Sequence, residues 1–354
     1  MNSRRRVNST VRWLLVSDRG QLMILSLRLI TLLLLLCPFT FAQRNQQRRL
    51  PIIDMHLHAY GAEWFAKSNP NPVTGKAPAL KNDEEHMQAT LAAMRRYNIV
   101  RGFVSNLNCP LDVLRRWRDA APDRIIATPY FEGTAGSPLP DINVLRSAYA
   151  SGWLGAMGEI GAQYGGLSPN DPKLEPYFAL AEQLDLPVGV HTGMSFPGIT
   201  YDPCCPNFRV TLGNPALLEE VLVRHPKLRL YIMHGGHPYL QETIAIMSVY
   251  PQVYADLAVI DWIIPREEFH EYLRSLIRAG MGKRLMFGSD QMTWPEAIGM
   301  AVEGIESARF LTREQKRDIF YNNAMRFLRW REENKQPAIS QRTPPSNSFN
   351  RSAR

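Results

Sequence analysis

The chain has 354 residues, of which 45% are hydrophobic, and this is enough for one large α/β domain or two smaller ones. The formal charge of +8 is concentrated at the two ends. The first 42 residues hold six Arg and one Asp, and residues 335–354 hold four basic residues and no acid. The part between them is close to neutral, which excludes the basic surface that a general nucleic-acid-binding protein needs.

The first 42 residues have the pattern of an export signal. An arginine-rich leader precedes the apolar run LITLLLLLCPF, and Thr40–Ala42 then forms a small-x-small pattern. We interpret residues 1–42 as a signal peptide cleaved before Gln43, which predicts a periplasmic or extracellular protein without a stable membrane span. Two alternatives stay open: an uncleaved N-terminal anchor, because the leader is long, and lipidation at Cys37, for which Leu36 is a poor preceding residue.

The mature chain would hold three cysteines: Cys109, Cys204 and Cys205. Three are too few for a framework of disulfides, even in an exported protein. Cys204 and Cys205 are adjacent in the chain, so a bond between them is difficult to form. If there is a disulfide, we expect it to join one of them to Cys109 and to leave the other as a thiol.

Eight short apolar segments of β type follow the signal, and segments with helical periodicity separate most of them. The strands are expected at residues 51–58, 97–106, 123–131, 154–161, 186–193, 228–236, 251–258 and 283–291. This alternation predicts an α/β fold, a (β/α)8 TIM barrel within residues 43–334. An open doubly wound sheet usually has a glycine-rich phosphate loop after its first strand, and the segment HLHAYGAEW does not match one.

Capping residues mark the ends of several predicted helices. Asn82 is placed to cap a helix over residues 82–98 that begins with acidic residues and ends with arginines. The segment TREQ at residues 312–315 is a capping box that opens the last helix. Further helices are expected within residues 171–186 and 214–226, and residues 335–354 have the composition of a disordered basic tail.

Histidines and carboxylates stand at the ends of the predicted strands. His56 and His58 end the first strand, and their spacing of two residues points both side chains to one face. Later strands end in other groups of this kind: Glu159, His191, His234, His237 and Asp290. Because active sites of (β/α)8 barrels lie at the C-terminal ends of the strands, this pattern predicts a site for Zn²⁺ or a similar divalent ion there.

Several roles stay open when the residues are considered alone. Glu159 could be a metal ligand, a carboxylate that orients another side chain, or a general acid or base. His234 could be a ligand or a base, and His237 could contact substrate or pack within its loop. The remaining histidines lie on helical or turn segments and are interpreted as structural: His86, His225 and His270.

The motifs DMHLH, VHTG, MHGG and GSD, in this order, and NNAMRFL near the end resemble those of the amidohydrolase superfamily, especially its amidohydrolase-related branch. The resemblance covers about residues 51–328. It implies a divalent metal, Zn²⁺ with Mn²⁺ as the alternative, bound by His56, His58, His191 and Asp290. It also implies that His234 positions or activates the water, or polarises the substrate.

The motif GEIG, which contains Glu159, resembles the corresponding motif of TatD-type two-metal hydrolases, in which the glutamate is a ligand. This resemblance implies that Glu159 could bridge to a second ion held by His191 and His234. The number of ions, one or two per chain, is open at this point. Glu159 is also a departure from the pattern of the decarboxylases in the branch.

The resemblance implies an enzyme that acts on a small molecule. In the hydrolase interpretation, metal-activated water attacks a C–N or C–O bond of an amide, lactone or ester, and Asp290 accepts the proton of the water. The alternative is a non-oxidative decarboxylase of the aminocarboxymuconate-semialdehyde decarboxylase type. In that alternative Arg209, on the loop after the fifth strand, would bind the carboxylate of the substrate. Since members of such families often form dimers, a homodimer is also expected.

Overall fold

The structure is a computed structural model that describes residues 50–61, 69–78, 80–106 and 111–331. The chain divides into residues 1–50 and 51–354, and the fold below is that of the second unit. The predicted signal peptide, Cys109 and the predicted tail lie outside the described residues. Among the helices of the described part, none is both long enough and apolar enough to cross a membrane.

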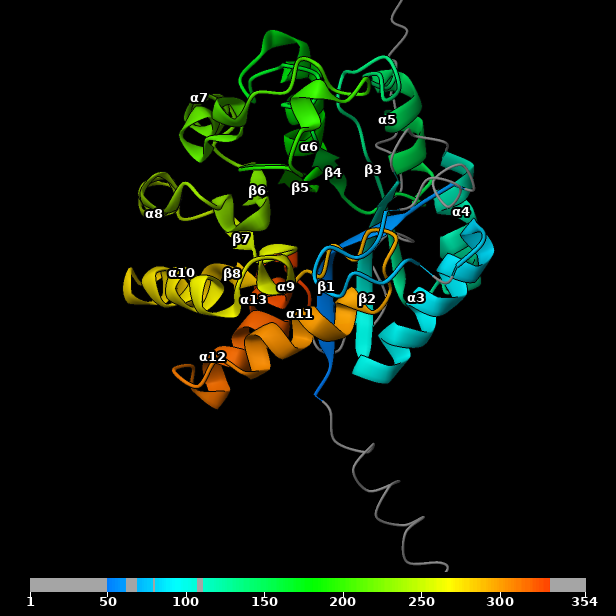
Figure 1. Cartoon of the computed structure of the whole chain (residues 1–354). Helices are drawn as coiled ribbons and strands as arrows, with labels where there is room; N and C mark the ends of the chain where they lie inside the picture. The colour runs from blue at the N-terminus through cyan, green and yellow to red at the C-terminus, as the bar shows by residue number, and fades with distance from the viewer. Residues whose placement is uncertain (1–49, 62–68, 79, 107–110, 332–354) are drawn as a thin grey trace, which may run out of the picture. The chain divides into compact units, whose positions relative to one another are not determined.

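Eight strands form the centre of the fold, and every neighbouring pair within a sheet is parallel (Figure 1). The first sheet has the order β1 (Ile52–Ala59), β2 (Ile99–Asn106) and β3 (Ile125–Pro129). The second has the order β4 (Met157–Ile160), β5 (Pro187–Val190), β6 (Arg229–Ile232), β7 (Tyr254–Asp256) and β8 (Leu285–Met286). All eight predicted strands are therefore present, most of them shorter than the sequence suggested.

Backbone hydrogen bonds connect the two sheets along both edges. At one edge, the amide of Gly155, before β4, donates to the carbonyl of Ala127 in β3, at 3.0 Å. At the other, the amide of Met55 in β1 donates to the carbonyl of Phe287, directly after β8, at 2.9 Å. The strands thus follow one another in sequence order around a (β/α)8 barrel, which confirms the predicted fold class.

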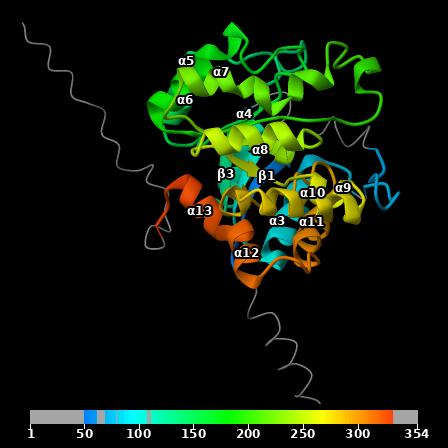
Figure 2. The same cartoon turned by 90° about the vertical axis from the view of Figure 1, so that its left-hand side faces the viewer.

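At least one helix follows each strand, and the helices cover the outside of the strands (Figures 1 and 2). They are α3 (Asp83–Tyr97), α4 (Leu111–Ala120), α5 (Ile142–Ala150), α6 (Glu175–Leu184), α7 (Glu219–Arg224), α8 (Leu240–Val249), α9 (Ile260–Ile263), α10 (Arg266–Arg278), α11 (Ala297–Glu306), α12 (Arg313–Arg317) and α13 (Asn323–Leu328). Within the described residues, seven short 3-10 or π-helical segments accompany them, and the π-helical segment Asp318–Asn322 lies between α12 and α13.

The predicted helix caps are confirmed. The Asn82 side chain accepts a hydrogen bond from the amide of Glu85 at the start of α3. Thr312 and Gln315 form the reciprocal capping box that opens α12. Each cap satisfies amides that would otherwise lack a partner in the first turn, which explains why these residues mark the helix starts.

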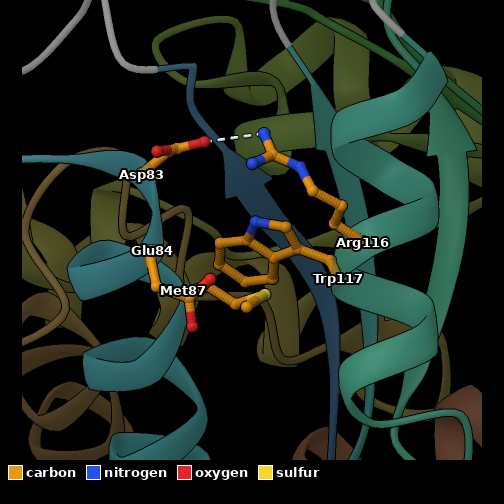
Figure 3. Close-up of a pocket in the computed structure, with 5 residues that line it drawn as sticks. All are labelled: Asp83, Glu84, Met87, Arg116 and Trp117. Carbon is orange, nitrogen blue, oxygen red and sulfur yellow. Dashed lines mark hydrogen bonds and ion pairs between the residues drawn. The ribbon is translucent and has the colours of Figure 1, made fainter.

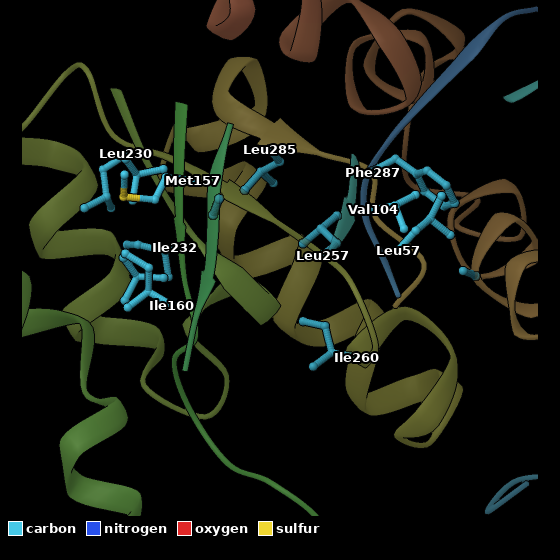
Figure 4. Packing of buried hydrophobic residues seen from close by; sticks show 14 of the residues in the cluster. Leu57, Val104, Met157, Ile160, Leu230, Ile232, Leu257, Ile260, Leu285 and Phe287 are labelled. Atoms are coloured by element: carbon cyan, nitrogen blue, oxygen red, sulfur yellow. The ribbon is translucent and has the colours of Figure 1, made fainter. Parts of the chain in front are cut away.

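A large apolar cluster lies between the strands and the surrounding helices (Figure 4). Leu57 on β1 and Leu230 on β6 are completely buried in this cluster. A second cluster contains Ile53 and Met55, and a register shift in β1 between Asp54 and Leu57 accompanies this change of neighbours. The apolar residues of β1 thus fix the strand from two sides and hold its histidine end in place.

Helices α3 and α4 meet around Trp117 (Figure 3). The Trp117 ring is buried and lies 5.5 Å from the ring of His86, whose Nε2 is 2.8 Å from the carbonyl oxygen of Met292. An ion pair of 2.6 Å between Arg116 and Asp83 closes the surface above it. These contacts support the structural role predicted for His86, and no residue lining this small pocket is one of the predicted metal ligands.

Candidate metal centre

The six residues predicted as ligands come together at the C-terminal ends of the strands. His56 and His58 belong to β1 and Glu159 to β4, whereas the other three lie in the segments that follow β5, β6 and β8. All six side chains are buried: His56, His58, Glu159, His191, His234 and Asp290. The barrel therefore assembles in space what the sequence distributes over 235 residues.

One group of donor atoms surrounds the end of β1. The Nε2 atoms of His56 and His58 are 3.2 Å apart, and Oε2 of Glu159 lies 3.1 Å from the first and 3.2 Å from the second. Oδ1 of Asp290 lies 3.1 Å from Nε2 of His58 and 4.0 Å from Nε2 of His56. The donor atoms of His56, His58 and Glu159 thus form one candidate ligand group, and Oδ1 of Asp290 also groups with His56 and His234.

A second group uses the other oxygen of the same glutamate. Oε1 of Glu159 lies 3.8 Å from Nε2 of His191 and 3.9 Å from Nε2 of His234. The donor atoms of these three residues are within 4.8 Å of one another. The Glu159 carboxylate therefore lies between two sets of histidines.

The first group fits a divalent ion. Two ligand nitrogens on a tetrahedral Zn²⁺, each about 2.0–2.1 Å from it, are about 3.3 Å apart, close to the 3.2 Å between His56 and His58. Oδ1 of Asp290 is buried and makes no hydrogen bond within the described residues, so its lone pairs are available to an ion. The wider second group has the same donor chemistry and fits a second ion with small movements of its side chains.

The second ring nitrogen, Nδ1, of each of the four histidines contacts an atom outside the ligand cluster. Nδ1 faces an oxygen atom in each case: Asp256 Oδ2 for His56 (3.2 Å), Ser105 Oγ for His58 (2.9 Å), Gln163 Oε1 for His191 (3.1 Å) and the carbonyl of Ala258 for His234 (3.2 Å). An acceptor at Nδ1 keeps the proton there and leaves Nε2 free to bind a metal. Sequence reasoning missed these supporting residues. Asp256 could have been found, because it stands at the end of β7, and the predicted ligands also stand at or just after the ends of their strands.

The carboxylates and histidines shift one another's pKa values. Burial lowers the pKa of His56, but the charges of Asp290 and Glu159 outweigh it and hold the pKa well above its ordinary value. Burial raises the pKa of Glu159, but the charge of His56 and hydrogen bonds from the histidines bring it well below its ordinary value. Burial lowers the pKa of His191 to about 3, so this ring is neutral at physiological pH.

Asp54, the first residue of the DMHLH motif, supports the site without joining the ligand cluster. Its Oδ1 accepts hydrogen bonds from the amides of His56 and Ser289, both at 3.0 Å, and its Oδ2 accepts one from the Ser289 hydroxyl at 2.7 Å. Burial raises the pKa of Asp54 to about 7, against the effect of these hydrogen bonds. Asp54 thus connects β1 to the segment that carries Asp290.

Two of the predicted ligands adopt a left-handed backbone. The φ angle is 58° at His234 and 42° at Asp290, a region that non-glycine residues seldom occupy. The backbone of His234 is held by a hydrogen bond from its amide to Oδ1 of Asp256, and the amide of Asp290 donates to the carbonyl of His56. Such backbone strain concentrates at functional sites, where the surrounding structure enforces it.

The two residues predicted to contact substrate lie apart from the ligand atoms. The ring of His237 packs edge-on against Tyr272, with 5.0 Å between ring centroids. Arg209 is exposed, and its Nη1 donates to the carbonyl oxygens of Pro206 and Phe208 in its own loop. Within the described residues, no side-chain hydrogen bond or ion pair joins either one to the ligand cluster, and their substrate roles stay predictions.

The disulfide expectation was wrong. Cys204 and Cys205 are bonded to each other, and Cys109 lies outside the described residues. The two cysteines lie in a tight turn, in which Asp202 accepts hydrogen bonds from the amide of Cys204 through its side chain and from the amide of Cys205 through its carbonyl.

Comparisons with known proteins agree with this geometry. The sequence profile of the amidohydrolase family matches residues 53–330. Protein fluG of Emericella nidulans is 26% identical over 123 residues, which are 35% of this chain but only 13% of that protein, so the chain spans a small part of its length.

Solved structures show the same fold. An uncharacterised TIM-barrel protein from Bordetella bronchiseptica has a TM-score of 0.61 and 19% identity, over 79% of this chain and 99% of that one. A probable 2-pyrone-4,6-dicarboxylic acid hydrolase from Acinetobacter baumannii has a TM-score of 0.55 and 14% identity, over 79% and 100%. A 2,6-dihydroxybenzoate decarboxylase has a TM-score of 0.53 and 14% identity, over 79% and 99%.

The structural neighbours include both a hydrolase and a decarboxylase, so they support the fold and leave the reaction open. The family match covers most of the chain, and the metal-ligand cluster lies within it. The chain therefore belongs to the amidohydrolase family.

Proposed function

We propose that the protein is a hydrolase with two divalent ions, and that it cleaves a C–N or C–O bond in a small amide, lactone or ester. The observation that carries this proposal is the position of Glu159. Its two carboxylate oxygens face different pairs of histidines, His56 with His58 and His191 with His234. A carboxylate shared in this way is suited to bridge two ions, and two-ion sites stabilise both the attacking and the leaving oxygen of a displacement.

The ligand set favours Zn²⁺, with Mn²⁺ as the alternative, because imidazole suits zinc and the carboxylates accept either ion. When bound, such an ion supplies Lewis-acid activation of water and of the substrate carbonyl. Oδ1 of Asp290 is placed beside the first group and makes no other hydrogen bond in the described part. It can accept a proton from the attacking water and return it to the leaving group. His234, on the other side of Glu159, can hold the second ion or polarise the carbonyl.

Decarboxylation is the rival reaction that the proposal must exclude. It needs a cationic group to hold the carboxylate of the substrate, and Arg209 was the candidate for that group. In the structure the guanidinium of Arg209 is bound to carbonyl oxygens of its own loop. This placement supports hydrolysis over decarboxylation.

The metal content of the Glu159→Gln variant tests the proposal. We expect two equivalents per chain in the unaltered protein and one in the variant, measured by mass spectrometry after growth with zinc and manganese. Glu182→Gln, which changes a glutamate on α6 outside the cluster, is the matched control and should keep both ions. One equivalent in both the unaltered protein and Glu159→Gln would contradict a bridging role, and a protein without metal would contradict the whole proposal.

The reaction itself is tested with two panels of compounds on the metal-loaded protein. One panel holds small amides, lactones and esters, and the other holds aromatic carboxylates. We expect acid release from the first panel and no CO₂ from the second. Release of CO₂ without hydrolysis would establish the decarboxylase instead.

We also propose that the protein is exported after cleavage between Ala42 and Gln43, on the evidence of the leader and the small-x-small pattern. N-terminal sequencing of the mature protein should begin at Gln43, and an intact or lipid-modified N-terminus would contradict this. The homodimer expected from the family resemblance is a further proposal, which light scattering tests as a mass about twice that of one chain.

A further inference from the structure

The turn that follows β4 holds both ring nitrogens of His191. Oε1 of Gln163 lies 3.1 Å from Nδ1, and the hydroxyl oxygen of Tyr164 lies 3.1 Å from Nε2. Nε2 is the atom that the proposed metal centre uses. Tyr164 therefore contacts the ligand atom itself, whereas Gln163 supports the ring from behind.

Close packing fixes this turn against the segment after β3. A Cβ atom at Gly165 would lie 2.5 Å from the carbonyl oxygen of Glu132, so only glycine fits there. The Tyr164 ring packs against His191 and Phe208, with 4.8 and 5.2 Å between ring centroids. The Tyr164 hydroxyl is thus directed toward the ligands by packing on several sides.

The hydrogen bonds of Gln163 determine where His191 carries its proton. Nε2 of Gln163 donates to the carbonyl of Gly193 at 2.9 Å, so the amide oxygen of Gln163 is the atom that faces His191. An acceptor at Nδ1 requires the proton of a neutral imidazole to be on Nδ1. Nε2 then has a free lone pair, and the Tyr164 hydroxyl can donate to it.

A metal ion and the Tyr164 proton compete for that lone pair. When Nε2 binds an ion, the hydroxyl can no longer donate to it, because nitrogen has only one lone pair in the ring plane. Packing of the Tyr164 ring against His191 and Phe208 would keep the hydroxyl in place. Its other acceptor is Oγ of Ser195, on the loop after β5, to which the Tyr164 hydroxyl donates at 3.0 Å.

We propose that Tyr164 is the hydrogen-bond donor to the substrate oxygen that becomes negatively charged when water attacks the carbonyl. The inference rests on the proposed hydrolase function. Donors that face a developing negative charge are among the largest contributions to acyl-group transfer. Tyr130, which also lies near the ligands, is already committed because its hydroxyl donates to Glu132. The acceptor that would remain to Tyr164 in the metal-bound site is the neutral hydroxyl of Ser195. A negatively charged substrate oxygen is a stronger acceptor than a neutral hydroxyl and can take its place.

Methylphosphonate is a suitable probe, because its tetrahedral anionic oxygens resemble the product of water addition to a carbonyl. The experiment uses the whole chain loaded with Co²⁺, whose visible absorption reports the ligands directly. We compare the unaltered protein with Tyr164→Phe, which keeps the ring packing and removes the hydroxyl. Tyr250→Phe is the control, since it removes a hydroxyl bound to Glu219 on the outer helices.

We expect Tyr164→Phe to bind the same amount of cobalt with the same spectrum, and to bind methylphosphonate about 10- to 100-fold more weakly, as for one hydrogen bond to a charged group. Tyr250→Phe should match the unaltered protein in both. Equal methylphosphonate affinity in Tyr164→Phe would overturn the proposal. Loss of cobalt or an altered spectrum in that variant would also overturn it, because Tyr164 would then only position His191.

Two further measurements separate the remaining outcomes. Ser195→Ala keeps the Tyr164 hydroxyl and should bind the probe within about threefold of the unaltered protein; a loss as large as that of Tyr164→Phe would assign the donor to Ser195 instead. Replacing Tyr164 by 3-fluorotyrosine keeps the shape of the side chain and makes its hydroxyl a stronger donor, so the probe should bind more tightly. This measurement is available even if Tyr164→Phe does not fold. Weaker binding of the probe would count against the proposal. An unaltered protein that takes up no cobalt would remove the proposed hydrolase function itself.

Discussion

In the part of the chain that the structure describes, two clusters combine histidine with carboxylates at hydrogen-bond distance, and one of these two fits a metal. On the outer layer, His225 at the end of α7 has Nε2 2.9 Å from Glu175 and Nδ1 3.2 Å from Glu182. Carboxylates thus occupy both of its ring nitrogens. At the strand ends, each histidine engages the scaffold through Nδ1 and turns Nε2 toward the other ligands.

The difference shows that proximity of histidine to carboxylate does not define a metal site. A ligand needs a lone pair that no proton occupies, aimed at a point that several donors share. The two sites also differ in their exposure to water. The Glu175 side chain is 38% exposed, whereas that of Glu159 is 5% exposed. Solvent screens the outer ion pairs, and burial strengthens the electrostatic interactions of the strand-end cluster.

The largest expected effect comes from removing one histidine of the strand-end cluster. His58→Ala should lower metal affinity by about 10³-fold or more, because it deletes a donor that no nearby group replaces. His225→Ala is the matched control and should keep the full metal content. Equilibrium dialysis with zinc measures both variants. A similar loss of zinc in His225→Ala would contradict the distinction between the two clusters.

A smaller effect is expected from pH, and only the strand-end cluster should show it. Despite burial, nearby carboxylates raise the pKa values of His56, His58 and His234 above the ordinary value, so these rings retain protons to higher pH when metal is absent. A metal ion must displace protons from these rings, so metal affinity should rise between pH 6 and 8, by about 100-fold for one proton released per ion.

Isothermal titration calorimetry in buffers of different ionisation enthalpy measures this proton release directly. His191, whose pKa is about 3, contributes nothing in this range because it is already neutral. Metal affinity that stays constant from pH 6 to 8 would show that the cluster holds no protons to displace.

The smallest effect should come from the outer cluster, as a change of stability alone. His225→Gln breaks the paired contacts to Glu175 and Glu182, and we expect the free energy of unfolding to fall by about 1 kcal/mol, since solvent screens these pairs. Chemical denaturation measures the change. A loss of several kcal/mol would mean that this cluster is more important to the fold than its exposure indicates.

Much of the fold was predictable because it depends on local patterns. The apolar strand segments, the Asn82 cap and the Thr312–Gln315 capping box are each visible within a few residues of sequence, and the structure confirms them. The lengths of the strands were less predictable. The segment 283–291 was expected as one strand, but β8 covers only Leu285–Met286, because the following residues turn to present Asp290.

The supporting residues were harder to predict, since their partners lie far away in the sequence. Asp256 contacts His56 from 200 residues away, and Gln163 contacts His191 from another strand end. No local pattern marks such pairs. The disulfide was misjudged for a related reason: whether adjacent cysteines bond depends on the local backbone conformation, which the residue spacing does not reveal.

The sequence by itself determined the order of strands and helices and the chemical types at the strand ends, because both follow from local periodicity and from residue identity. Only the tertiary structure decided that both oxygens of Glu159 face histidines and that Tyr164 contacts Nε2 of His191. These are distances between groups on different strands. They depend on how the whole barrel packs, and contacts between residues far apart in the sequence determine that packing.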